Sequence, residues 1–153
     1  MDEKFLIFTV RDRKYALPAR IIGEVAALDK VFPLPLVPSY VLGIINRYSV
    51  PYALIDINFL LFNENSEAKK LIVLKEEIDK LALLIDDVTD IADLPSEKIM
   101  NIEQDGNNVP INAVNSFFEW NGSQVFCLDT AEIISLVKRE FEQPDAKNLA
   151  AGN

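Results

Sequence analysis

The second half of the sequence repeats a strand-rich pattern of the first half, and this repeat restricts the folds that the chain can adopt. Residues 14–17 (Lys-Tyr-Ala-Leu) align with residues 80–83 (Lys-Leu-Ala-Leu), and residues 22–28 then fall on residues 88–94 without a gap, at a constant offset of about 66 positions. A repeat of this length is typical of two copies of one structural unit. We therefore predict two similar small β-rich units, one in each half of the chain.

Each unit is predicted to consist mainly of short strands. Phe5–Val10 and Tyr15–Leu17 are rich in apolar, β-branched and aromatic residues and flank a polar segment, which predicts an N-terminal hairpin. Ile21–Val25 favours a third strand, although so short a pattern also suits a helix.

A polar, turn-rich stretch at residues 63–70 marks the boundary between the units. We predict a first subdomain at 1–64 and a second at 65–143. The second is expected to end in an amphipathic helix from Thr130 to Glu142, because its apolar residues recur at helical spacing. Residues 144–153 have little to bury, so we expect a mobile tail.

A proline-rich stretch precedes the end of the first unit. Three prolines between residues 33 and 38 exclude a regular helix, because proline fixes φ and lacks an amide donor, and they predict a stiff loop. The loop leads to a predicted strand, turn and strand within residues 43–57. Asp56 and Asp129 each end an apolar run before a helical segment, and capping of the helix is favoured over a shared metal site.

The composition excludes several classes of partner. The chain has 15 Lys and Arg against 24 Asp and Glu, a net charge of −9, which disfavours nucleic acid and anionic membrane surfaces. No apolar run reaches the roughly 18 residues of a membrane helix, and the N-terminus lacks the pattern of a signal peptide. We expect a cytoplasmic protein without direct membrane insertion, in which Cys127, the single cysteine, is a buried apolar residue.

The sequence offers no catalytic constellation. It contains no histidine, which is the commonest proton-transfer side chain near neutral pH and a frequent metal ligand. Asp86 and Asp87 are adjacent and would point to opposite faces of a strand, so they cannot act as an acid–base pair. Trp120 lies beside Asn121-Gly122, a strong hairpin signal, which favours packing over binding. We predict no enzyme activity, no cofactor and no metal site.

The motifs also occur in an order that has a counterpart in a known family. After the N-terminal hairpin they are 22–25 (Ile-Gly-Glu-Val), 40–46 (Tyr-Val-Leu-Gly-Ile-Ile-Asn), 54–57 (Leu-Ile-Asp-Ile), 83–91 (Leu-Leu-Ile-Asp-Asp-Val-Thr-Asp-Ile) and 94–95 (Leu-Pro). From Phe5 to about Val137, this series resembles the CheW-type coupling domain of bacterial chemotaxis.

The resemblance implies a mainly β fold of two small five-stranded β-barrels of the Src-homology type, packed together, with short helices and a C-terminal helix. It implies a non-enzymatic adaptor that links the cytoplasmic tips of chemoreceptors to the regulatory domain of a chemotaxis histidine kinase. Such a protein would associate with membrane receptor arrays through these partners. Self-association of the chain into rings is a further possible interaction.

The sequence departs from the family pattern at one place. The family usually continues from the asparagine at position 46 with Leu-Arg-Gly, and it usually has a proline at position 53. Here these slots hold Arg47, Tyr48, Ser49 and Ala53. Because side chains alternate along a strand, we expect Arg47 on the face opposite Tyr48 unless a bulge intervenes. The change predicts altered partner choice rather than an altered fold.

We expect partners to contact exposed apolar positions and strand edges of both units. For each aliphatic candidate, core packing is the alternative. Three alternative functions remain. The chain could be an adaptor for another receptor–kinase pathway, such as one for surface motility or development, or a competitor in the array. The third alternative is a small-molecule-binding β-domain. The candidate partner-binding residues are Ile22, Glu24, Val25, Ile44, Arg47, Tyr48, Leu84, Val88 and Ile91.

Tyr48→Arg is predicted to alter receptor or kinase binding and to leave the melting temperature nearly unchanged, because an exposed contact residue contributes to binding and little to folding. Binding assays and thermal denaturation of the same variant test this. A large loss of stability with no change in binding would contradict an exposed contact role for Tyr48.

Overall fold

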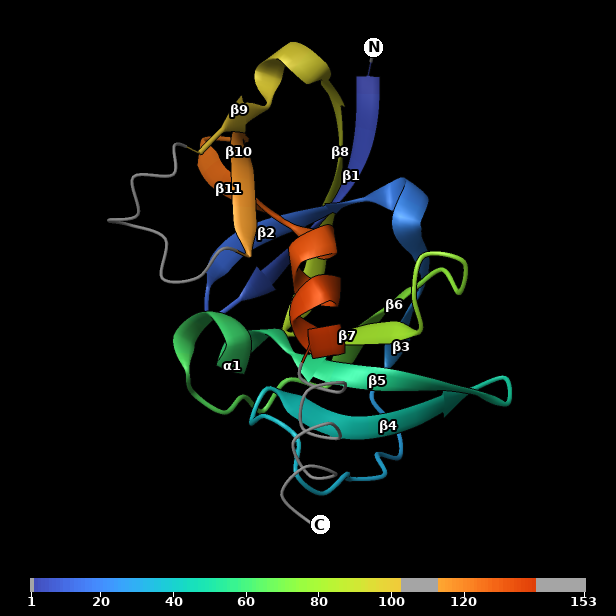
Figure 1. The fold of residues 1–153 in the computed structure, drawn as a ribbon. Coiled ribbons are helices and arrows are strands. Elements are labelled where there is room, and N and C mark those ends of the chain that lie inside the picture. The colour runs from blue at the N-terminus through green and yellow to red at the C-terminus, as the bar shows by residue number, and fades with distance from the viewer. Residues whose placement is uncertain (1, 103–112, 140–153) are drawn as a thin grey trace.

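Two β-sheets hold most of the chain (Figure 1), and the computed structural model describes residues 2–102 and 113–139. In spatial order the six-stranded sheet contains β8 (Asp87–Pro95), β1 (Asp2–Val10), β2 (Arg13–Pro18), β11 (Ser123–Leu128), β10 (Val114–Trp120) and β9 (Met100–Asn101). The five-stranded sheet contains β3 (Ile22–Ala27), β6 (Lys70–Leu74), β7 (Leu81–Ile85), β5 (Val50–Asp56) and β4 (Val41–Arg47). The helices are η1 (Ala19–Ile21), α1 (Ile57–Phe62), η2 (Ser96–Lys98) and a C-terminal helix at residues 130–139.

The predicted class of fold, mainly β with short helices and a C-terminal helix, is confirmed. The N-terminal hairpin and the third strand also form as expected, as β1–β2 and β3. In the described part of the chain, however, no backbone pairing between edge strands closes either sheet into a complete barrel. The predicted tail at 144–153 lies outside the described residues.

Each half of the chain lends a hairpin to the sheet of the other half. Strand β1 pairs with β8, and β2 pairs in parallel with β11, so the N-terminal hairpin belongs to the sheet of the second half. Hairpin β6–β7 pairs in the same way with β3 and, in parallel, with β5. The expectation of one β-unit per half is corrected here, because both sheets need strands from both halves. Each sheet contains strands from both of the predicted ranges, 1–64 and 65–143. The division of the chain into these two subdomains stays a prediction.

The sequence repeat is visible as two sheets with the same strand order. Leaving out β9, the order β8-β1-β2-β11-β10 corresponds strand for strand to β3-β6-β7-β5-β4, and each sheet contains one parallel pair at the same place. Even the irregularities correspond, because the register shifts between Val41 and Gly43 in one sheet and between Val114 and Ser116 in the other.

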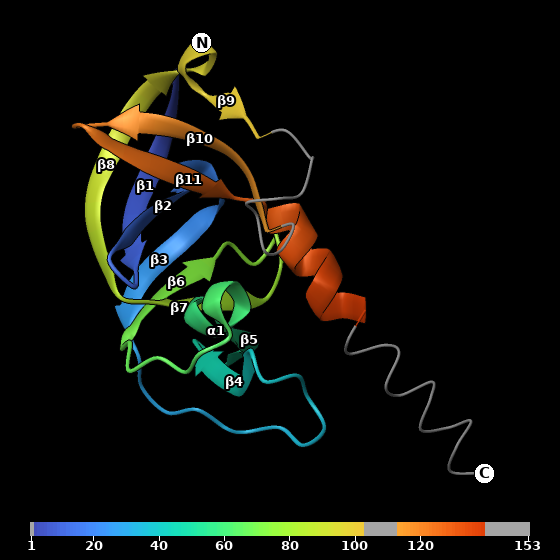
Figure 2. The same ribbon diagram turned by 90° about the vertical axis from the view of Figure 1, so that its left-hand side faces the viewer.

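The main core lies between the two sheets (Figure 2). Alternation along β1 sends Leu6 and Phe8 toward the five-stranded sheet, whereas Phe5 and Ile7 belong to a separate cluster within the six-stranded sheet. The C-terminal helix packs against the core between the sheets through Ile133 and its neighbours. Repeat-related residues meet in this core, namely Leu6, Phe8 and Leu17 with Ile72, Leu74 and Leu83.

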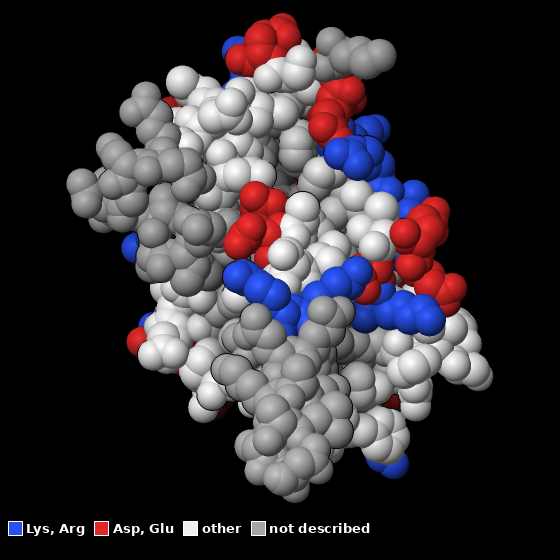
Figure 3. Space-filling view, in the orientation of Figure 1, with Lys and Arg blue, Asp and Glu red and all other residues white. Residues whose placement is uncertain are grey.

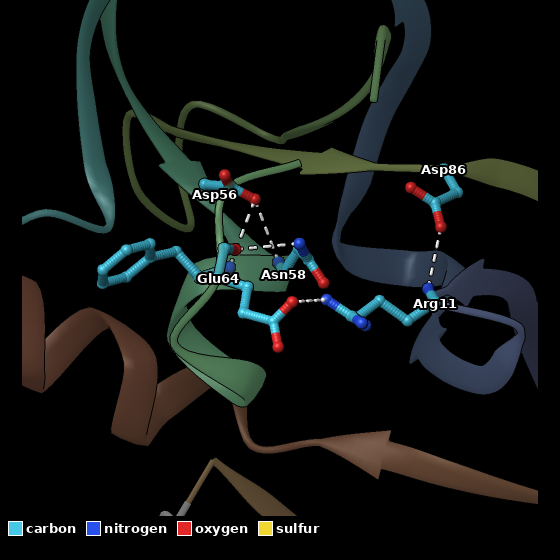
Figure 4. Close-up of polar contacts among 6 residues, drawn as sticks. Arg11, Asp56, Asn58, Glu64 and Asp86 are labelled. Atoms are coloured by element: carbon cyan, nitrogen blue, oxygen red, sulfur yellow. Dashed lines mark hydrogen bonds and ion pairs between the residues drawn. The ribbon is translucent and has the colours of Figure 1, made fainter. Parts of the chain in front are cut away.

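Polar contacts tie the tip of the N-terminal hairpin to the five-stranded sheet (Figure 4). The backbone amide of Arg11 donates to Asp86 Oδ2 at 2.8 Å, and its guanidinium lies 2.5 Å from Glu64 Oε2. Asn58 Nδ2 donates to the carbonyl of Glu64 at 2.9 Å, which fixes the segment that carries Glu64. The guanidinium of Arg11 also lies over the Phe62 ring, 5.6 Å from its centroid.

Both predicted aspartate caps form. Asp56 Oδ1 accepts bonds from the amides of Asn58 at 3.0 Å and Phe59 at 3.4 Å, at the start of α1. Asp129 Oδ1 accepts from the amide of Glu132 at 3.0 Å at the start of the C-terminal helix. Asp56 is 2% exposed, and this burial raises the pKa of its carboxyl above the ordinary value.

The raised pKa of Asp56 predicts a pH dependence of stability. The folded state binds the proton more tightly than the unfolded state, so the native protein gains stability as pH falls through the folded pKa. Asp56→Asn keeps an oxygen acceptor for the cap and removes this titration. We expect the free energy of unfolding of the wild type, relative to Asp56→Asn, to increase when urea denaturation is repeated from about pH 7 to about pH 4. A difference that is constant with pH would contradict the assignment.

Candidate partner-binding surface

The turn between β4 and β5 presents an exposed tyrosine. Arg47 pairs with Val50 across the hairpin, which leaves Tyr48 and Ser49 as a two-residue turn. Their φ angles are 52° and 68°, and positive φ at both central positions is the pattern of a type I′ turn. The Tyr48 side chain is 84% exposed, more than any other large apolar residue of the described chain.

Arg47 contacts the ring of this tyrosine and forms an ion pair with Glu24. The nitrogens Nη2 and Nε of Arg47 lie 2.9 and 3.1 Å from the same oxygen, Oε1 of Glu24. The hydrogen bond that Nε donates to the Glu24 carboxylate raises the pKa of the guanidinium, which stays charged. The guanidinium carbon also lies 5.5 Å from the centroid of the Tyr48 ring. The expected placement on opposite faces is therefore wrong, because Tyr48 lies in the turn, where strand alternation no longer applies.

The ion pair joins the two edges of the five-stranded sheet. Glu24 belongs to β3 and Arg47 to β4, which are the first and last strands of that sheet. The loop that follows β3 also approaches β4, where Phe32 and Ile44 exchange two backbone hydrogen bonds of 2.8 Å. This approach requires Gly43, since a Cβ atom there would lie 2.3 Å from the Phe32 carbonyl oxygen. The sheet thus curls until its edges are joined by side chains.

The six-stranded sheet has a contact at the equivalent place. Trp120 Nε1 donates to Asp90 Oδ2 at 2.6 Å, and this bond lowers the pKa of the Asp90 carboxyl. Asp90 aligns with Glu24 in the sequence repeat, and Trp120, like Arg47, is the last strand residue before a two-residue turn. Sequence reasoning did not identify this pair as part of a site. The repeat alignment could have indicated it, because the carboxylate of Asp90 aligns with the carboxylate of Glu24.

The predicted apolar candidates fall into three groups. Val25 and Ile91, which the repeat aligns, are 45% and 58% exposed at equivalent strand positions of the two sheets. Ile22 and Val88, also aligned, are partly buried against the core between the sheets. Ile44 is partly buried beside Phe32, and Leu84 is 2% exposed in the interior of the five-stranded sheet. The Leu84 side chain is therefore a core residue.

A hollow lies beside the Glu24–Arg47 ion pair. It has a volume of about 260 Å³, and Tyr52 and Val73 contribute apolar atoms to its wall. Its rim carries charges of both signs, from Lys75 and Glu76 as well as from the ion pair.

Charges of both signs are mixed on one face of the molecule. Basic and acidic side chains adjoin one another on the face shown in Figure 3. One of the ion pairs of the described chain joins Lys138 and Asp79, at 3.7 Å. Such a surface has no single strong field to attract a polyanion. In residues 2–102 and 113–139, no helix has the length and hydrophobicity needed to span a bilayer.

No reactive group accompanies this surface in the part of the chain that is described. No group of three or more His, Cys, Asp or Glu side chains there could hold a metal ion. Cys127 is 5% exposed, and burial raises the pKa of its thiol, which disfavours the nucleophilic thiolate. Two equivalent sheets with exposed apolar side chains at corresponding strands define a protein-binding scaffold.

Comparison with known proteins identifies the family. The chain belongs to the CheW-like domain family, whose model matches residues 4–138. The structure is similar to the crystal structure of the scaffolding protein TtCheW from Thermoanaerobacter tengcongensis, with a TM-score of 0.72 over 84% of this chain and 85% of that chain. The sequence identity is 18%, so this likeness concerns the fold. No curated protein matches the sequence.

The family match confirms the resemblance seen in the sequence and the prediction of a protein that is not an enzyme, since CheW family proteins are non-enzymatic scaffolds. It supports a role as a chemotaxis adaptor.

The Glu24–Arg47 contact predicts a salt-dependent loss of stability. Glu24→Gln keeps the size of the side chain and removes its charge. Because the two side chains are 29% and 23% exposed, we expect a loss of about 1 kcal/mol or less in the free energy of unfolding. In urea denaturation the loss should shrink between about 0.1 M and about 1 M NaCl. Glu3→Gln, in the more exposed pair with Arg20, is the control with a smaller expected effect. A loss that is unchanged by salt would contradict an electrostatic contact.

Proposed function

We propose that this chain couples the cytoplasmic tips of chemoreceptors to the regulatory domain of a chemotaxis histidine kinase. In this role it binds both proteins without catalysing a reaction and associates with membrane receptor arrays through them. Membership of the CheW-like family supports the class of function. The exposed positions on both sheets supply surfaces for two partners.

One comparison within the chain carries the proposal. The turn between β10 and β11 consists of Asn121 and Gly122, with φ of 51° and 80°, and Asn-Gly is the favoured pair for a type I′ turn. The equivalent turn of the other sheet contains Tyr48 and Ser49 at similar angles. The Asn121-Gly122 turn therefore has the residues that a hairpin of this geometry favours. The other turn departs from it at Tyr48, the most exposed large apolar residue of the described chain.

This departure is unfavourable for the isolated molecule. A residue other than glycine in the left-handed region costs about 1–2 kcal/mol, and Tyr48 also leaves its ring in water instead of burying it. Aromatic side chains held in one orientation are frequent anchors of protein interfaces. The contacts from Arg47 to Tyr48 and Glu24 limit the motion of the ring before binding, which lowers the entropy cost of association.

Val25 and Ile91 extend the proposed surfaces along strands β3 and β8. They occupy equivalent positions, so each sheet offers an exposed aliphatic side chain near its edge contact. A standard interface buries about 800 Å² on each partner, which requires such neighbours around a central anchor. We therefore propose Glu24, Arg47 and Tyr48 as one partner surface, with Val25 on the opposite face of the same edge strand, and Val88 and Ile91 as part of the other.

A pull-down with the purified full chain tests the function. The probes are the kinase regulatory domain and the receptor tips of the same cell, and retention of both is expected. Binding to a kinase of a surface-motility or developmental pathway instead would assign the chain to that pathway. Failure of the folded protein to bind any kinase of this type would reject the proposal.

Exchanging the turns separates binding from folding. In the double variant Tyr48→Asn with Ser49→Gly, the first hairpin receives the turn of the second. We expect a higher melting temperature, because the new pair suits positive φ, together with binding at least about tenfold weaker, as for loss of an interface anchor.

The matched control is the double variant Asn121→Tyr with Gly122→Ser, which should lower the melting temperature without affecting the surface around Tyr48. Thermal denaturation and titration calorimetry measure both quantities. Unchanged binding by the first double variant would contradict the role of Tyr48.

A further inference from the structure

A short sequence motif recurs beside β4 and beside β10. Residues 29–32 read Asp-Lys-Val-Phe, and residues 97–100 read Glu-Lys-Ile-Met. Phe32 pairs with Ile44 of β4, and Met100 pairs with Phe117 of β10. Ile44 and Phe117 are equivalent, because each stands three residues before the last residue of its strand. The motif therefore occupies the same place in both sheets.

Each copy of the motif lines a hollow. The β4 hollow has a volume of about 200 Å³, and Asp29 and Lys30 line it together with residues of β4. The β10 hollow has a volume of about 540 Å³, and Glu97 and Lys98 line it together with residues of β10. It lies where η2 and β9 run beside β10, at the end of the molecule away from the five-stranded sheet (Figure 1). The repeat thus produces two equivalent hollows of different size.

The two hollows also differ in charge. The β4 hollow is lined by one carboxylate and by two cations, Lys30 and Arg47. The β10 hollow is lined by two carboxylates, Glu97 and Glu119, and by one cation, Lys98. Compared with the β4 hollow, the β10 hollow has one cation fewer and one carboxylate more.

In the β4 hollow, the additional cation lies near two carboxylates. Arg47 forms an ion pair with Glu24, and the charge of Asp29 also contributes to the raised pKa of its guanidinium. The equivalent strand position in the six-stranded sheet holds Trp120, whose Nε1 donates a hydrogen bond to Asp90. The chain therefore supplies no arginine at this position of the β10 hollow.

The two carboxylates of the β10 hollow have no charged partner in the described chain. Neither Glu97 nor Glu119 forms an ion pair or a side-chain hydrogen bond with another described residue, and both are exposed. The same hollow is lined by Met100, which is 57% exposed, and by the partly exposed Phe117. The Phe117 ring contacts the Phe126 ring, with centroids 6.3 Å apart. The hollow thus offers unpaired carboxylates beside an aromatic ring.

We propose that the β10 hollow binds an arginine side chain of a partner protein, between Glu97 and Glu119 and against the ring of Phe117. The inference rests on the proposed function, in which the chain binds other proteins, and it adds the chemistry of one contact. Charge complementarity selects a cation, because carboxylates outnumber cations in the lining. Arginine is favoured over lysine, because its planar fork donates to two carboxylates and stacks on an aromatic ring.

Titration with N-acetylarginine methylamide tests the site directly. In amide NMR spectra of the full chain, we expect saturable shifts at residues 97–100 and 117–122. The citrulline analogue, which has a similar shape without the charge, should cause none. Glu119→Asn gives the β10 hollow the residue that the β4 hollow has at Asn46, and it should weaken binding about two- to fivefold, as for loss of an exposed ion pair. Asp29→Asn in the β4 hollow is the matched control and should leave the affinity unchanged.

Titration calorimetry with the kinase regulatory domain and, separately, with the receptor tip tests the contact in a protein complex. For the double variant Glu97→Gln with Glu119→Asn, we expect binding to one of these proteins to weaken at least about fivefold. The melting temperature should stay unchanged, because both side chains are exposed.

The outcomes separate this proposal from the proposed function. If the wild type and the double variant bind both proteins equally well, the arginine site is overturned and the proposed function stands. Equal shifts with the arginine and citrulline amides would also overturn the site. If the wild type binds neither protein, the proposed function fails, whereas saturable binding of the arginine amide at this hollow would still support the site.

Discussion

Exchange of hairpins between the two halves is the constraint on which this structure depends. Strand β2 lies parallel to β11 and β7 lies parallel to β5, and these two pairings complete the sheets. The same exchange places the faces of β1, β2, β6 and β7 against each other and so creates the core between the sheets. The Glu24–Arg47 ion pair also follows from it, because these residues meet at the edges of a sheet whose inner strands β6 and β7 come from the other half.

Much of the local structure could be predicted from the sequence. Apolar runs indicated the strands, Asn121-Gly122 indicated a tight turn, and Asp56 and Asp129 were recognisable as caps, because each feature depends on neighbours within a few residues. The exchange of hairpins was not predictable in this way. The repeat is compatible with each unit closing on itself or with the units trading hairpins, and only contacts between distant strands decide between these arrangements.

The site was predictable in part for the same reason. Tyr48 stood out as a departure from a family pattern, and its exposure agrees with a contact role. Leu84 was chosen by pattern as well, but alternation along β7 points it into the core. Asp90 and Trp120 were passed over, since a hydrogen bond between residues on strands β8 and β10 has no local signature. The repeat allows the two sheets to be compared position by position. Where equivalent positions carry different residues, the fold does not require either residue, and the difference can reflect binding.

The exchanged hairpin also affects the order in which the protein can fold during synthesis. Strands β1 and β2 are synthesised before the other strands described, yet their partners β8 and β11 lie between Asp87 and Leu128 and are made much later. The five-stranded sheet has all its strands once Ile85 has emerged, so it can be completed earlier. Domains generally form as units during translation, but here the hairpin that is synthesised before the other strands is among the last elements to be paired. Until then, the apolar faces of this hairpin remain available to chaperones or to aggregation.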